Sequence, residues 1–404
     1  MQIGLDGSSV IYSDLSSEQK ALLEEVDRAC RELRPIEDQF YLERRFNDRI
    51  VPTFRKYSLL GLPISSKYGK GRGVDTVTYA LALERIGMEG TGVRTFFSGH
   101  ISLGQLTVER WGNEEQKERY LTPATRGDIV FAFGLTEPEA GSDPASLRTE
   151  FEAKDGHYVL NGTKYLISNG SIADVVIVFA YPKGKRDGMC AFIVNSDSDG
   201  FQATQLKEKV GMFTSDTAMF EMRNVKVPKE NLLGPRGKGL SIAYSALMNG
   251  RLSVAAGCVG VIRDCLEEVL DYSKKKTEAG KVVARNQWVQ SHIADIATKM
   301  EAARDITYTA ATIKARYEKQ PSNVELRSEA DRLVAQAKYF ASNAAHNSAE
   351  AAVKILGYNG QSFEYRSPRH LCDVRVTRIY EGTDEIMQLR IASLLLGRDY
   401  EAYQ

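Results

Sequence analysis

Hydrophobic residues recur with a helical period over the first part of the chain. Beyond Leu15 the apolar positions are spaced three or four residues apart, at Leu22, Leu23, Val26 and Cys30. Ser16 and Gln19 have the spacing of a capping box, in which two side chains and two backbone amides bond reciprocally at a helix start. The helical pattern continues over 75–94 and 99–122. We therefore predict a helical domain over residues 1–125.

Near residue 130 the pattern changes to short runs rich in β-branched and aromatic residues. Asp155-Gly156 and Asn161-Gly162 separate the first of these runs, and both dipeptides favour two-residue hairpin turns. The runs lie at 151–153, 158–160, 165–167, 175–179, 191–194 and 219–227. Mostly antiparallel β structure is therefore predicted over 126–235.

Beyond Gly239 the helical period returns and persists. One stripe of mainly small residues consists of Ala330, Leu333, Ala337, Phe340, Ala344, Ala351 and Ile355. Gly357 follows it as a candidate C-cap. The stripe indicates either a seam between close-packed helices or an oligomer interface. Helices, then strands, then helices predict an α+β protein whose third domain covers 236–404.

Composition excludes several classes of function. The 404 residues contain 53 Lys+Arg and 53 Asp+Glu, so no net field attracts nucleic acid or an acidic membrane. Five scattered cysteines without CxxC spacing, and histidines without a ligand cluster, predict neither disulfides nor a metal site. The longest apolar run, 175–181, is too short to span a bilayer. Asp6 and Asp14, with no basic residue before Lys20, do not resemble a targeting signal, so we expect a cytoplasmic protein.

The segment 378–386 is a first candidate for chemistry. It places Glu381 beside Gly382, between an apolar stretch and the expected start of the next helix. A carboxylate there can remove a proton from an activated carbon while neighbouring amides bind an oxygen. A Glu near a helix N-terminus is also explained simply by the helix dipole.

The segment 133–143 is a second candidate. Pro138 forces an extended turn, and Gly141, Ser142 and Asp143 offer open backbone amides and a hydroxyl. Such a loop can cradle a ligand or serve as a polar connection into the first strand. Composition alone favours the polar connection.

Together with Asn161-Gly162-Thr163-Lys164, these two segments resemble the acyl-CoA dehydrogenase family of flavoproteins, in order and at the family's spacing. The resemblance implies an N-terminal helical domain, a middle β-barrel-like domain and a C-terminal four-helix bundle. It implies FAD as cofactor and an acyl-CoA substrate oxidised to the trans-2-enoyl thioester. An electron-transfer flavoprotein is the implied electron acceptor, with an oxidase using O₂ not excluded. A homotetramer is implied because family flavin sites are completed across a subunit boundary.

The resemblance also assigns cofactor contacts. Leu166 replaces the aromatic residue usual in the strand behind the flavin, and Ser168 keeps a hydroxyl there. Lys276 and Lys354 replace the Arg and Gln usual near the adenosine diphosphate, which a neighbouring subunit contacts. Lysine keeps a positive charge but lacks the bidentate fork of arginine. The implied cofactor residues are Phe133, Leu135, Thr136, Gly141, Ser142, Leu166, Ile167, Ser168, Lys276, Gln287, Lys354, Gly357, Thr383 and Glu385.

In the family the glutamate matching Glu381 is the catalytic base. Some members carry the base instead immediately before the residue matching Arg251, but this chain has Gly250 there. Met248 stands where Arg251 usually has an acidic companion near the coenzyme moiety. The implied substrate contacts are Arg94, Ser98, Ser142, Met248, Arg251, Tyr380 and Gly382.

Arg94 has two interpretations. A cation beside Phe96 and Phe97 on a helix is more often a snorkelling surface residue. In the glutaryl-CoA dehydrogenase branch, however, an Arg at about this place and a Ser four residues later pair with a substrate carboxylate. Arg94 and Ser98 have that spacing, while Phe96 and Phe97 would narrow the acyl pocket.

Two further functions stay open. The altered coenzyme contact at Met248 leaves room for a dehydrogenase of carrier-protein thioesters. The substitutions at Lys276, Ala279, Lys354 and Tyr358 leave room for a binding or assembly protein without turnover, which the intact 380–383 segment opposes. Bleaching of the flavin by acyl thioesters discriminates between a dehydrogenase and a binding or assembly protein.

Overall fold

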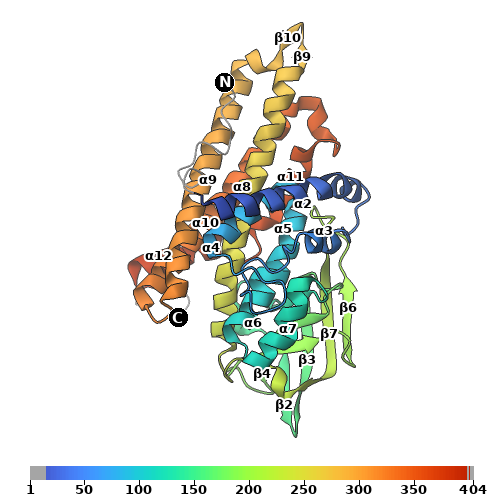
Figure 1. Cartoon of the computed structure of the whole chain (residues 1–404), viewed down its shortest axis with the longest axis vertical. Helices are drawn as coiled ribbons and strands as arrows, with labels where there is room; N and C mark the ends of the chain where they lie inside the picture. Colours follow the sequence, from blue (N-terminus) through green and yellow to red (C-terminus); the bar gives the residue numbers. More distant parts are fainter. Residues whose placement is uncertain (1–14, 398–399, 401–404) are drawn as a thin grey trace.

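The computed structural model describes residues 15–397 and 400. Its first region is helical, as predicted, and the Ser16–Gln19 capping box is present. A π-helix, η1 (Ser98–Gln105), continues α5 without a break into α6. The helices are α2 (Ser17–Leu42), α3 (Ile50–Lys56), α4 (Thr76–Glu89), α5 (Thr91–Phe97), α6 (Leu106–Trp111) and α7 (Glu114–Arg126), drawn in blue to green in Figure 1.

The strands form a mixed sheet in which antiparallel pairs predominate. The order is β6-β7-β3-β2-β4-β5-β8, and β1 pairs with β4 beside this path. The β1–β4 and β2–β4 pairs are parallel. The strands are β1 (Phe131–Gly134), β2 (Glu150–Lys154), β3 (His157–Ser168), β4 (Val175–Pro182), β5 (Cys190–Asn195), β6 (Phe201–Gln205), β7 (Thr217–Pro228) and β8 (Leu232–Leu233).

Only one of the two predicted hairpin turns exists. Asp155-Gly156 joins β2 to β3 where Lys154 pairs with His157, and Gly156 has a φ of 80°. The predicted turn at Asn161-Gly162 is wrong, because β3 runs straight through it. The register against β7 shifts there, and the missing Cβ of Gly162 lets Thr149 approach. The dipeptide therefore forms a β-bulge within a long strand.

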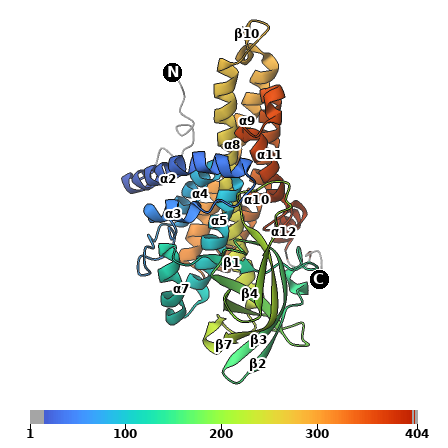
Figure 2. The same ribbon diagram turned by 90° about the vertical axis from the view of Figure 1, so that its right-hand side faces the viewer.

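Long helices form the third region. They stand side by side, with the sheet towards one end and a small hairpin at the other (Figures 1 and 2). Gly357 is the C-cap of α10, as predicted. The elements are α8 (Gly239–Lys275), β9 (Thr277–Glu278), β10 (Lys281–Val282), α9 (Gln287–Lys319), α10 (Val324–Leu356), α11 (Arg366–Val374) and α12 (Asp384–Leu396).

The alanine-rich stripe of α10 is mainly a seam within the chain. Ala330, Ala337 and Ala344 are buried where α10 packs on α8 and α9. Phe340 is the member that remains exposed. The domain limits 125/126 and 235/236 stay predictions.

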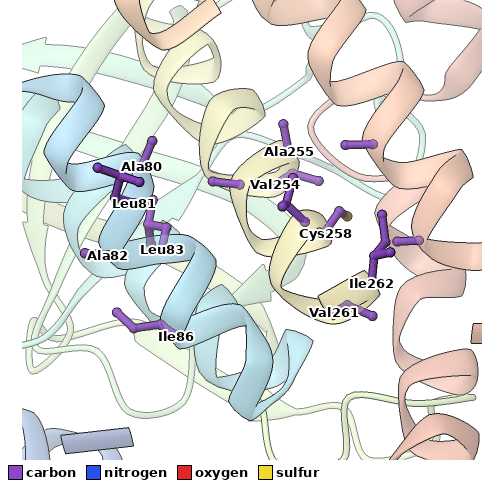
Figure 3. Close-up of a cluster of buried hydrophobic side chains, with 14 of the residues drawn as sticks. Ala80, Leu81, Ala82, Leu83, Ile86, Val254, Ala255, Cys258, Val261 and Ile262 are labelled. Carbon is purple, nitrogen blue, oxygen red and sulfur yellow. The ribbon is translucent and has the colours of Figure 1, made fainter. Parts of the chain in front are cut away.

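The N-terminal helices join the bundle through a close contact between α4 and α8. A Cβ on Gly87 would lie 2.4 Å from the Gly257 carbonyl oxygen, and one on Gly260 would lie 2.0 Å from the Glu84 carbonyl oxygen. Glycine at these positions lets the two backbones touch. Apolar side chains fill the space around the contact in Figure 3: Ala80, Leu81, Ala82, Leu83, Ile86, Val254, Ala255, Cys258, Val261 and Ile262.

Helix α8 is apolar enough that composition alone would permit a membrane span. Its most apolar window of 18 residues has a mean hydropathy of 1.3, but 83% of that window is buried inside the protein. This apolar character reflects its place at the centre of the bundle. The helix contains no long uninterrupted apolar run, so its mean hydropathy over 18 residues is the feature of the sequence that marks it. We expected no targeting signal because of Asp6 and Asp14. Both residues lie outside the described part of the chain.

Candidate functional site

A cavity of about 1150 Å³ lies where the sheet, α8 and the 375–383 segment meet. It brings together residues from the 133–143 loop, the end of β3, α8 and the 378–386 segment, while Arg94, Lys276 and Lys354 do not line it. From the sheet side it is lined by Leu135, Thr136, Gly141, Ser142, Leu166 and Ser168. From the helical side it is lined by Met248, Arg251, Tyr380, Glu381, Gly382 and Thr383.

A buried ion pair fixes the loop on the sheet side. Glu137 Oε1 lies 2.8 Å from Lys164 Nζ, and Lys164 also donates to the Leu135 carbonyl at 3.2 Å. The Tyr165 amide donates to the Thr136 carbonyl at 2.9 Å. Burial acts to raise the pKa of Glu137, but Lys164 together with hydrogen bonds from Thr149 and the Arg148 amide holds the pKa below its usual value. The two upstream motifs are thus one interacting unit.

Leu166 projects its side chain beside the cavity from a strained backbone position. Its φ is +58°, a conformation rarely adopted by residues with a side chain, and it stays 57% exposed. The register of β3 against β7 shifts between Lys164 and Ile167 to accommodate it. Phe133 and Ile167 are buried in hydrophobic clusters and do not line the cavity, so the structure separates them from the other predicted cofactor residues.

Glu381 lies on the wall of the cavity with its carboxylate against α8. A Cβ on Gly250 would lie 2.4 Å from Glu381 Oε2, so only glycine leaves room for this carboxylate. Oε2 is buried and has no hydrogen-bond partner in the described part of the chain. Burial raises the pKa of Glu381 to about 7, against the opposing effect of Arg251, Arg94 and Lys338. The side chain is therefore able to exchange a proton near neutral pH.

Two cations hold the backbone around Glu381. Arg251 Nε donates to the Glu381 carbonyl at 3.0 Å, and Lys338 Nζ donates to the Gly382 carbonyl at 2.6 Å. The acidic partner of Arg251 is Asp331 on α10, at 3.6 Å, rather than a residue at position 248. Our sequence reasoning missed Asp331 and Lys338. Each directly follows an alanine of the stripe, seven residues apart, a position that could have identified them.

Arg94 is not a surface residue, so the favoured interpretation of its sequence context was wrong. It is 2% exposed, and its guanidinium donates to the Tyr380 hydroxyl and lies 5.5 Å from the Tyr380 ring centre. Ser98 Oγ is buried, and no residue that the structure describes forms a hydrogen bond with it. Neither residue lines the cavity itself. Phe96 and Phe97 do not narrow it either, because they pack on each other and Phe97 packs on Phe54.

Four predicted cofactor residues lie far from the cavity of their own chain. Lys276 and Gln287 flank the β9–β10 hairpin at the far end of the bundle (Figure 1). Gly357 ends α10 beside this region, since Tyr272 on α8 donates to the Leu356 carbonyl at 3.1 Å. Lys354 on the same last turn pairs with Glu350 at 2.9 Å.

Thr383 and Glu385, the last two predicted cofactor residues, lie at the start of α12. Thr383 is the N-cap of α12, and its side chain accepts from the Ile386 amide at 3.3 Å. Glu385 is exposed in the first turn of α12 and does not line the cavity. Within residues 15–397 and 400, no group of three or more His, Cys, Asp or Glu side chains is arranged to hold a metal ion.

Comparison with known families covers nearly all of these elements. Three models match in chain order: the acyl-CoA dehydrogenase N-terminal domain over residues 16–128, the middle domain over 132–225 and the C-terminal domain over 237–396. An acyl-CoA dehydrogenase of Bacillus subtilis (strain 168) is 39% identical over 373 residues, which are 92% of this chain and 96% of the relative. The chain belongs to the acyl-CoA dehydrogenase family, whose members are oxidoreductases acting on CH–CH groups.

Solved structures agree with this assignment. Butyryl-CoA dehydrogenase from Megasphaera elsdenii is 34% identical with a TM-score of 0.88, over 95% of this chain and 99% of that one. A glutaryl-CoA dehydrogenase from Mycobacterium smegmatis, in complex with FADH2, is 27% identical with a TM-score of 0.88, over 96% and 97% of the two chains. The predicted fold class, with N-terminal helical, middle β and C-terminal helical regions, is confirmed.

The pKa of Glu381 predicts a specific dependence of stability on pH. Between its ordinary value of 4.5 and about 7, the folded protein binds a proton that the unfolded chain has released. Folding stability attributable to this group therefore falls as pH rises through that window. Glu381→Gln removes the penalty, so relative to wild type it should gain about 2 kcal/mol between pH 5 and pH 8. Urea unfolding at the two pH values measures this.

Glu364→Gln is the matched control, because Glu364 is exposed on the surface. Its stability relative to wild type should not change between pH 5 and pH 8. An equally flat difference for Glu381→Gln would show that Glu381 is already ionised at pH 5.

Proposed function

We propose that this protein is an FAD-dependent dehydrogenase that converts a short-chain acyl-CoA thioester into the trans-2-enoyl-CoA, with Glu381 as the base that removes the α-proton. The observation that carries the proposal is the Glu381 carboxylate at the cavity, whose Oε2 is buried beside Gly250 with no hydrogen-bond partner among the described residues. A base with a pKa of about 7 is matched to proton abstraction near neutral pH.

The cofactor is FAD, and the residues on the sheet side of the cavity fit it. Leu166 offers an exposed apolar surface to a flat ring, while Thr136 and Ser142 offer hydroxyls. Gly141 has no atom within 4 Å of its absent Cβ, so its backbone is open to close approach. When bound, FAD supplies the acceptor for the hydride lost from the β-carbon.

The protein's own part in the reaction is to position and polarise the thioester. The backbone amide of Glu381 is the donor we assign to the thioester oxygen, where it stabilises charge that develops as the α-proton leaves. Arg251 and Lys338 hold the two carbonyls of this segment, so the carboxylate and the amide keep a fixed relation. Position 250, where some family members carry the base, is a glycine, so we assign the proton to Glu381.

A short acyl chain and CoA are the substrate features we favour. The relatives that support a short chain include the butyryl-CoA dehydrogenase of similar fold. A carrier-protein thioester is the alternative for the carrier, since Met248 does not supply the usual acidic contact. The electron acceptor we propose, by resemblance, is an electron-transfer flavoprotein. A cytoplasmic location stays a prediction.

We also propose a homotetramer in which Lys276, Gln287, Lys354 and Gly357 contact the FAD of a neighbouring subunit. The support is their position, since these residues lie at the end of the bundle away from their own cavity. Light scattering of the FAD-loaded protein should give a mass of about four chains of 44.9 kDa. A monomer that retains stoichiometric FAD would contradict this assembly.

The central test is an anaerobic titration with acyl-CoA thioesters, in which the oxidised flavin absorbance should bleach with butyryl-CoA. Glu381→Gln should keep the flavin spectrum but lose at least ~10³-fold in turnover, because it lacks a proton acceptor. Glu364→Gln should behave as wild type. Near-normal turnover in Glu381→Gln would place the base elsewhere. Bound FAD that no thioester bleaches would instead favour a binding or assembly protein.

A second candidate function is a glutaryl-CoA-type dehydrogenase, favoured by the environment of Arg94. Within the described residues, no carboxylate lies within the 4 Å ion-pair distance of this buried guanidinium. An unpaired buried charge is costly. The substrate's terminal carboxylate would provide a partner beside Tyr380, with Ser98 Oγ available to assist.

Arg94→Met separates the two substrate classes. If the acyl chain is dicarboxylic, wild type should favour glutaryl-CoA over butyryl-CoA by roughly 2–3 kcal/mol in kcat/KM, and the variant should lose that preference. Steady-state kinetics with both thioesters measures it. Arg85→Met, which removes another buried arginine one helix away, is the control and should leave the ranking unchanged. The same ranking in wild type and Arg94→Met would assign Arg94 a structural role.

A further inference from the structure

The backbone that carries Glu381 adopts an unusual conformation that two buried cations stabilise. Glu381 has a φ of +57° and Gly382 a φ of +100°, so two successive residues lie in the left-handed half of backbone space. A residue with a side chain rarely adopts this conformation and needs support from its surroundings. The carbonyl of Glu381 accepts from Arg251, and the carbonyl of Gly382 accepts from Lys338.

Lys338 differs from Arg251 because it does not line the cavity. It lies on α10 with 0% of its surface exposed, and the described residues include no carboxylate within 4 Å of its ammonium. Its ammonium donates to the Gly382 carbonyl at 2.6 Å. The N-terminus of α12 begins two residues later at Asp384, and a helix N-terminus disfavours a cation. The packing of α10 therefore does not explain a charged side chain here.

We propose that Lys338 is a positioning residue for Glu381, whose ammonium holds the Gly382 carbonyl, fixes the left-handed turn and stabilises the ionised carboxylate that accepts the substrate proton. This inference rests on the proposed role of Glu381 as the base. Lys338 acts through the turn and through its charge, without touching the substrate.

The charged groups around Lys338 and Glu381 determine how removal of the Lys338 ammonium changes the pKa of Glu381. The groups that face Lys338 are Asp384 on α12, Arg251 and Cys258 on α8, and Glu381. The charged groups that face Glu381 are Arg251 on α8, Arg94 on α5 and Lys338 on α10. All three act to lower the pKa of Glu381, so loss of Lys338 leaves two cations and a carboxyl that ionises at higher pH.

The test compares Lys338→Met with Lys338→Gln in the FAD-loaded protein. Infrared difference titration follows the carboxyl band that Glu381→Gln abolishes. Both neutral variants should move its midpoint upward by about one pH unit, since each lacks the nearby charge. At pH 7 kcat should fall about 10- to 100-fold, with a smaller change in KM and partial recovery at higher pH. Lys338→Gln keeps a donor for Gly382 and should retain more activity than Lys338→Met, while Lys338→Arg should restore the midpoint.

Ala337→Gly is the matched control, because it weakens α10 one residue away without changing any charge. It should keep the wild-type midpoint. If the midpoint in Lys338→Gln also equals that of wild type, the inference is overturned, whether or not Glu381 is the base. If the midpoint moves but wild type acts on no thioester, the proposed function fails and the inference about Lys338 stands.

Discussion

The close approach of α4 to α8 is the constraint on which the rest of the structure depends. Gly257 and Gly260 remove side chains from one face of α8 so that the backbone of α4 can touch it. Gly250 lies two helical turns before Gly257, on the same face. It leaves the space that the Glu381 carboxylate occupies, while Gly257 leaves space for the Arg94 side chain. One glycine-lined face therefore joins the domains and sets the position of the candidate base.

The electrostatics of the site are a balance between burial and positive charge. Burial acts to raise the pKa of Glu381, because a buried carboxylate loses its hydration. Arg251, Arg94 and Lys338 act against that effect from three different helices, and the pKa comes to about 7. A base must be free of its proton yet basic enough to take another, and this intermediate value satisfies both conditions. Arg251 and Lys338 also hold the backbone carbonyls of Glu381 and Gly382, so these two side chains supply both charge and geometry.

The sequence predicted those features that depend on neighbouring residues. The Ser16 capping box, the Asp155-Gly156 turn and the Gly357 C-cap are local interactions, and each was found. The turn predicted at Asn161-Gly162 was wrong, because the pairing of β3 with β2 and β7 outweighs the local turn preference. The interpretation of Arg94 as a surface residue was wrong, because aromatic neighbours on a helix do not reveal that α8 and Tyr380 cover its charge. The spacing of the stripe marks the positions of Asp331 and Lys338 but not their partners, which lie at least 44 positions away in the chain.

The motif residues that carried the resemblance are physically coupled to one another. Glu137 and Lys164 belong to two separate motifs, and each is buried with the other as its charge partner. Removing either one would leave an uncompensated buried charge, which is strongly destabilising. The pair holds the Leu135–Thr136 backbone at the edge of the cavity through Lys164 and Tyr165. A polar loop that merely connected elements would need no buried ion pair, so this coupling is the physical argument against the polar-connection interpretation of 133–143.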